Sequence, residues 1–128
     1  MTIRGLLHAT CGVLCAAIAS FAQSTNASIY GTITDSSSAV ISTSIVVALN
    51  TKTGVSLSTV TNESGVYIFA SLQPGEYSVT AEAAGFRKAI ASKIQLDVSA
   101  RITVNLKLEI GTATESVMVE SSAGVVTV

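Results

Sequence analysis

Residues 61–81, which read TNESGVYIFASLQPGEYSVTA, contain the signals that decide the fold of this chain. The apolar run 66–69 and the alternating run 77–81 both have the composition of short β-strands. A turn precedes each run. The turn at 62–65 ends in a glycine, which accepts a positive φ, and the turn at 73–76 joins a proline to a glycine. We therefore expect two strands here, and we interpret residues 62–65 as the loop of a β-hairpin.

Alternation of apolar and polar residues continues on both sides of this stretch. Further strands are expected at about residues 29–33, 45–49, 55–59, 94–98 and 102–108. The last of these is the clearest, because every apolar residue in it is followed by a polar one. Few segments have helical periodicity. About seven short strands separated by turns predict an all-β sandwich of seven antiparallel strands, whose two sheets pack their apolar faces together.

The N-terminal segment has the three-part pattern of a secretory signal peptide. Arg4 supplies the positive charge, residues 5–21 are mostly apolar, and small residues lead up to Ala22. The apolar run is short for a membrane anchor. We therefore expect residues 1–22 to be removed on export, which leaves a mature chain that begins at residue 23.

Both cysteines and the single histidine lie in this segment, as Cys11, Cys15 and His8. Thr10 and Leu14 precede the cysteines and fit a lipoprotein signal poorly, so we expect no lipid anchor. The mature chain then holds no thiol, no disulfide and no imidazole. Because zinc sites almost always use cysteine or histidine, and histidine is the usual general base, we expect no catalytic residues, no metal and no cofactor.

Charge and length set further limits on function. Of seven basic residues, all except Arg4 belong to residues 23–128, so six basic residues face eight acidic ones and the mature net charge is about −2. No basic patch stands out, so we expect no nucleic-acid partner. The length suits one domain, which we expect to be a monomer.

Several short motifs, taken together, resemble those of a known family. They are IYGTITD at 29–35, AVI at 39–41, TNESGVY at 61–67, LQPGEYSV at 72–79 and AGF at 84–86. With these motifs the chain resembles the carboxypeptidase regulatory-like domain, a transthyretin-like sandwich with the general architecture of an immunoglobulin domain. The resemblance covers about residues 27–109. Together with the signal pattern, it divides the chain into an expected signal peptide at 1–22, the sandwich at 23–110 and a separate C-terminal segment at 111–128.

The chain looks most similar to copies of this domain at the N-terminus of TonB-dependent outer-membrane receptors, where a plug and a β-barrel follow. Residues 111–117, GTATESV, resemble the exit toward the plug. We expect residues 111–128 to be a linker or the start of a truncated following domain. The chain as a whole would then be the product of a truncated gene, a fragment or a stand-alone relative. The resemblance implies an exported protein of the periplasm or outer membrane, or a secreted one. Its partner would be an envelope protein or the missing plug and barrel.

The loop at residues 35–43 departs from the family pattern. Ser38 stands where the family often has glycine, and residues 42–43 stand where it often has Pro-Gly, so the shape of this loop is left open. A calcium site built from Asp35 and nearby serine hydroxyls is conceivable there. The eight carboxylates are otherwise scattered over turns and outward positions, which favours a solvated surface over a paired-acid catalytic site.

Aromatic side chains bear on carbohydrate binding, because rings stack on sugars. Tyr67, Phe69 and Tyr77 follow the core pattern of the family, Phe86 is expected to close one end of the sandwich, and Tyr30 is expected to point outward. The sequence reveals no aromatic platform. Since a sandwich also has open sheet edges that accept another strand, we favour a non-catalytic interaction module. A carbohydrate-binding module of the starch-binding-like fold is the alternative.

Overall fold

The computed structural model describes residues 25–112, 116–120 and 125–127. Within these residues ten strands are present: β1 (Ala27–Asp35), β2 (Ile45–Asn50), β3 (Ser56–Val60), β4 (Val66–Leu72), β5 (Gly75–Glu82), β6 (Lys88–Leu96), β7 (Arg101–Val104), β8 (Leu106–Leu108), β9 (Ser116–Glu120) and β10 (Val125–Thr127). In this part of the chain no helix is long and apolar enough to cross a membrane. The expected signal peptide at 1–22 lies outside the described residues.

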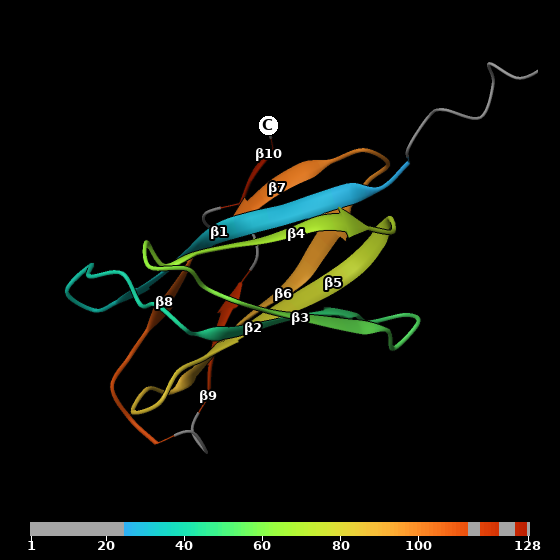
Figure 1. The fold of residues 1–128 in the computed structure, drawn as a ribbon. Coiled ribbons are helices and arrows are strands. Elements are labelled where there is room, and N and C mark those ends of the chain that lie inside the picture. Colours follow the sequence, from blue (N-terminus) through green and yellow to red (C-terminus); the bar gives the residue numbers. More distant parts are fainter. Residues whose placement is uncertain (1–24, 113–115, 121–124, 128) are drawn as a thin grey trace, which may run out of the picture.

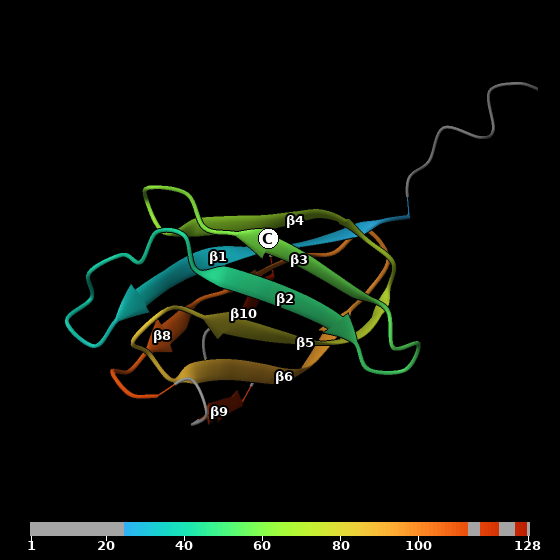
Figure 2. The same ribbon diagram turned by 60° about the horizontal axis from the view of Figure 1, so that its bottom comes forward.

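The strands form two sheets that pack face to face (Figures 1 and 2). One sheet has the order β10-β7-β1-β4, with β8 also paired to β1, and the other has the order β3-β2-β5-β6-β9. Alternate residues such as Ile29 and Ile33 of β1 and Val79 of β5 point inward and form one continuous core. The expected all-β fold of two packed sheets is therefore confirmed.

Three strand pairs differ from the expected antiparallel pattern. β1 pairs in parallel with β7 and with β8, and β6 pairs in parallel with β9. Parallel neighbours need a long connection, and several strands separate β1 from β7 along the chain. The short turns from which antiparallel pairing was predicted report only on neighbours in sequence. In the segment expected to be a linker or the start of a following domain, residues 116–120 form β9 of one sheet and residues 125–127 form β10 of the other.

The turn at residues 62–65 has the expected chemistry but joins different partners. The Asn62 side-chain oxygen accepts hydrogen bonds from the backbone of Ser64 and Val66, and Gly65 has a φ of 72°. However, β3 pairs with β2 and β4 pairs with β1. The hairpin expected here is therefore wrong, because the turn carries the chain from one sheet to the other.

The run at 102–108, expected as one strand, is interrupted at Asn105, between β7 and β8. The Asn105 side-chain oxygen takes the place of a backbone acceptor and receives the N–H of Thr32 at 2.9 Å. The carbonyl oxygen of Val104 turns inward instead and accepts the buried hydroxyl of Tyr67 at 2.5 Å. Gly31 makes room for this contact, because a Cβ there would lie 1.9 Å from the Val104 oxygen.

Buried polar groups at both ends of β2 fix which of its faces points inward. Val46 and Ala48 are buried together with Ser44 and Asn50. The Ser44 hydroxyl donates to the carbonyl of Glu82 at 2.8 Å, and the Asn50 side chain accepts two backbone N–H groups of the following turn. Because buried polar groups need partners, these bonds hold the even-numbered residues inside. The larger odd-numbered residues of β2 therefore face outward.

The loop at 35–43 uses the two positions at which the sequence departs from the family pattern. Ser38 has a φ of 69° and Thr43 a φ of 57°. This left-handed region suits glycine and is costly for a β-branched residue such as threonine. The loop keeps its shape through Asp35 and through the bond from the N–H of Ile41 to the carbonyl of Ile33 at 2.9 Å.

We predict that Tyr67→Phe lowers the free energy of unfolding by about 1–3 kcal/mol, because the buried Val104 carbonyl loses its partner. The change should be measured by urea denaturation. Tyr30→Phe is the matched control, since Tyr30 lies on the outer surface and its loss of a hydroxyl should change stability by less than about 0.5 kcal/mol. Equal effects of the two variants would contradict this account of the core.

We predict that Thr43→Gly stabilises the protein by about 0.5–1 kcal/mol, since glycine adopts the positive φ at this position without strain. Thr32→Gly, in the middle of β1, should instead destabilise the protein by about 0.5–1 kcal/mol, because glycine raises the conformational entropy of the unfolded chain and relieves no strain in the folded one. Thermal unfolding of both variants tests the sign of each effect. A loss of stability in Thr43→Gly would show that the loop is not strained.

Candidate functional site

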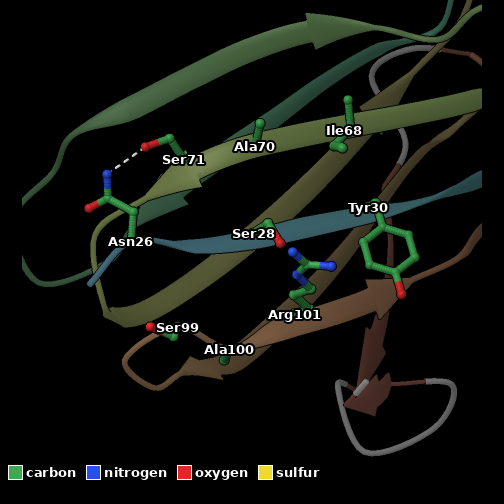
Figure 3. A pocket seen from close by; sticks show the side chains of 9 residues that line it. All are labelled: Asn26, Ser28, Tyr30, Ile68, Ala70, Ser71, Ser99, Ala100 and Arg101. Carbon is green, nitrogen blue, oxygen red and sulfur yellow. Dashed lines mark hydrogen bonds between the residues drawn. The ribbon is translucent and has the colours of Figure 1, made fainter. Parts of the chain in front are cut away.

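A hollow of about 720 Å³ lies on the outer face of the sheet that contains β1, β4 and β7. Figure 3 shows the side chains that surround it. They are Asn26, Ser28, Tyr30, Ile68, Ala70, Ser71, Ser99, Ala100 and Arg101. The hollow exists because small side chains in its middle are flanked by three larger ones.

Strand pairing fixes the three large side chains beside one another. Tyr30 on β1 lies directly opposite Ile68 on β4, and Ser28 on β1 lies directly opposite Arg101 on β7. Since Ala27 and Ile29 point into the core, the alternation of β1 sends Ser28 and Tyr30 outward. Their positions therefore depend on the regular backbone of a sheet and not on a loop.

Hydrogen bonds hold the rim at the start of β1. The Asn26 side-chain nitrogen donates to the Ser71 hydroxyl at 2.6 Å, which ties the beginning of β1 to the end of β4 (Figure 3). On the other side, the N–H of Ser28 donates to the carbonyl of Ala100 at 2.9 Å. These bonds connect three neighbouring strands, so the shape of the hollow is set before any ligand arrives.

The groups around the hollow are suited to binding. Arg101 is exposed and makes no ion pair with another described residue, so its guanidinium is available to a carboxylate or phosphate. Ile68 is 59% exposed and offers apolar surface, and Tyr30 adds an aromatic ring and a hydroxyl. The hydroxyl of Ser28 adds a group that can donate and accept hydrogen bonds.

The other aromatic residues lie where the sequence places them. Tyr67, Phe69 and Tyr77 are buried, and Phe86 is partly buried and packs against the core. The rings of Tyr67 and Phe69 meet edge to face with centroids 5.9 Å apart. Burial raises the pKa of Tyr67 well above its ordinary value, so this phenol stays protonated and remains a donor. Tyr30 is the aromatic residue of the hollow.

Asp35 serves the turn in which it lies. Its Oδ1 accepts the N–H of Ser37 at 2.8 Å, the Ser37 hydroxyl at 2.6 Å and the N–H of Ala39 at 3.0 Å. The Ser37 hydroxyl is the main cause that lowers the pKa of Asp35, and Lys107 adds to it. Among the described residues no three acidic, cysteine or histidine side chains converge into a metal-binding group.

The other acidic side chains that the structure describes are spread over the surface. Glu82 forms an ion pair with Lys88 at 2.9 Å, and Glu109 forms one with Arg87 at 3.6 Å. The side chains of both pairs are partly exposed to solvent, so the pairs contribute little to stability. Glu115 lies outside the described residues. The sequence did not predict that Arg101 lies beside Ser28 at the hollow, because this position depends on the parallel pairing of β1 with β7.

Comparison with known proteins identifies similar domains. Residues 28–109 match the family model described as the carboxypeptidase regulatory-like domain. A comparison with curated proteins gives no match. Among solved structures, the chain is similar to a candidate carbohydrate-binding protein from Bacteroides uniformis ATCC 8492, with a TM-score of 0.53 and 16% identity over 65% of this chain and 41% of that one.

Two dioxygenases are also similar in structure. Hydroxyquinol 1,2-dioxygenase from Pseudomonas putida DLL-E4 has a TM-score of 0.52 and 8% identity, over 71% of this chain and 58% of that one. Catechol 1,2-dioxygenase from Acinetobacter radioresistens has a TM-score of 0.50 and 12% identity, over 74% and 58%. The chain thus spans between 41% and 58% of the length of these structures. At such low identities the likeness concerns the fold alone.

Proposed function

Because the chain belongs to the carboxypeptidase regulatory-like domain family, we propose that it is a non-catalytic, exported module that holds a partner protein in the bacterial cell envelope. The resemblance of its motifs to the N-terminal domain of TonB-dependent receptors supports a position in the periplasm or at the outer membrane. A secreted form is the alternative location.

The hollow around Tyr30 and Arg101 is the observation that carries this proposal. It combines apolar surface at Ile68, a guanidinium that makes no ion pair with another described residue, and hydrogen-bonding groups, which is the mixture typical of protein-binding surfaces. Arginine and tyrosine are also the residues most often found to dominate binding energy. The rigid sheet below them keeps the ordering cost of binding low.

We predict that a photoreactive phenylalanine analogue at position 68 cross-links in cells to an envelope protein. The same analogue at position 80 is the control, since Thr80 points outward from the middle of the opposite sheet, on β5. Adding Arg101→Ala to the position-68 variant should reduce the adduct at least about fivefold, as expected for a residue that contributes more than about 1 kcal/mol.

An absent adduct, or equal adducts from positions 68 and 80, would contradict docking at the hollow. Cell fractionation of the same strains tests the location separately. A protein that remains in the cytoplasm with an intact N-terminus would overturn the proposal of export, whatever the cross-linking result.

Carbohydrate binding is the second candidate, and the ring of Tyr30 beside polar groups favours it. A solved structure with a similar fold is a candidate carbohydrate-binding protein, which adds support. Because Arg101 brings a positive charge to the hollow, a sugar that carries a carboxylate suits it better than a neutral sugar.

We predict, for this second candidate, that a uronic-acid oligosaccharide binds with a dissociation constant of about 1 mM or tighter in calorimetric titration. Tyr30→Ala should abolish binding and Tyr30→Phe should keep it, since phenylalanine retains the stacking surface. A matched neutral oligosaccharide should bind more weakly. If no oligosaccharide saturates the protein, the carbohydrate proposal fails and the protein-partner proposal is unaffected.

A further inference from the structure

Strand β3 forms an open edge of the second sheet. It pairs with β2 on one side, and in the strand order no described strand lies on its other side. The carbonyl of Val55 accepts the N–H of Asn50, and the N–H of Thr61 donates to the carbonyl of Ser44. Alternation along an antiparallel ladder therefore turns the backbone groups of Ser56, Ser58 and Val60 away from β2, toward the open side.

This edge lacks the features that usually prevent strand pairing. Its sequence, SLSTV, has no charge, no proline and no glycine, and its register with β2 is continuous. The edge strand of the other sheet, β4, differs because its pairing with β1 has a register shift. Leu57 and Val60 on β3 are 47% and 53% exposed, so a neighbouring strand would cover apolar side chains as well as backbone groups.

We propose that β3 pairs antiparallel with β3 of a second copy of this chain, so that two sheets become one continuous sheet. A two-fold axis at Ser58 places Ser58 opposite its own copy and Ser56 opposite Val60. These are the residues whose backbone groups face the open side, and the members of each pair exchange both hydrogen bonds. On the inner face, Leu57 lies opposite Thr59 of the second copy.

The charges at the two ends of β3 support this partner and this direction. Lys52 lies in the turn before β3 and Glu63 in the turn after it, and both side chains are exposed. Neither forms an ion pair with another described residue. An antiparallel arrangement brings the Lys52 turn of each copy to the Glu63 turn of the other, so two opposite-charge contacts form at once. A parallel arrangement would bring like charges together.

A hollow of about 280 Å³ beside β3 adds to the argument. Val55 and Leu57 line it together with Leu72 and Tyr77, where the edges of the two sheets separate. In the proposed dimer the second copy covers the β3 side of this opening. The length of the chain predicts one domain, and the residue pattern does not reveal which of its strands lies at an open edge.

The test is sedimentation equilibrium of the full chain over about 1 µM to 1 mM, with a reductant present so that Cys11 and Cys15 cannot link copies. We expect a dimer with a dissociation constant of about 10–100 µM, since a single strand pair gives a small interface. Ser58→Pro removes a donor from the open side, and Ser58→Lys adds a repelling charge. Each should weaken the dimer at least about tenfold.

Thr80→Lys is the matched control, because Thr80 points outward from β5, which has a neighbour on each side. It should leave dimerisation unchanged. Thermal unfolding of every variant separates loss of pairing from loss of folding. If the wild-type chain stays monomeric at concentrations up to about 1 mM, well above the expected dissociation constant, the proposal is overturned.

Charge reversal tests the direction of pairing. Lys52→Glu and Glu63→Lys should each weaken the dimer by roughly 2- to 20-fold, and the double variant should return to within about threefold of the wild type. The contact would belong to another surface if substitutions at position 58 left the dissociation constant of the dimer unchanged. The same would follow if the double variant dimerised no more tightly than the two single variants.

Discussion

The bond from the Tyr67 hydroxyl to the Val104 carbonyl is the interaction on which the first sheet depends. It requires a glycine at position 31, so that the ring can lie across β1, and it requires the strand to break at Asn105, so that the carbonyl can turn inward. Each condition would be unfavourable alone. Together they join β4, β1 and β7 into one unit, and the outer face of this unit carries Tyr30, Ile68 and Arg101.

Much of the fold could be predicted because side-chain alternation is a local property. The positions of β1, β2, β4 and β5, the turn at 62–65 and the burial of Tyr67 all follow from neighbouring residues. Pairing between distant strands is not local, which is why the parallel contacts of β1 and the route of the 62–65 turn between sheets were missed. Asn105 fits a regular alternation of polar and apolar residues in the sequence. Its hydrogen bond with the N–H of Thr32, on a distant strand, could not be predicted from that alternation.

The candidate sites were harder to predict for the same reason. Tyr30 could be placed outward from its own strand, but Arg101 reaches it only through the β1–β7 pairing. The hollow lies on the outer face of one sheet, whereas the open edge of β3 belongs to the other. No residue of β3 lines the hollow around Tyr30 and Arg101, so a ligand in the hollow and a second copy at β3 can be held together.

The place of β1 has a mechanical consequence. This strand is paired on both sides, with β4 on one side and with β7 and β8 on the other. Hydrogen bonds of a sheet run across the strands, so tension applied along β1 strains both ladders in shear. The bonds must then rupture collectively instead of opening one after another. A domain built in this way resists traction at its N-terminal end far better than a domain whose first strand lies at an edge.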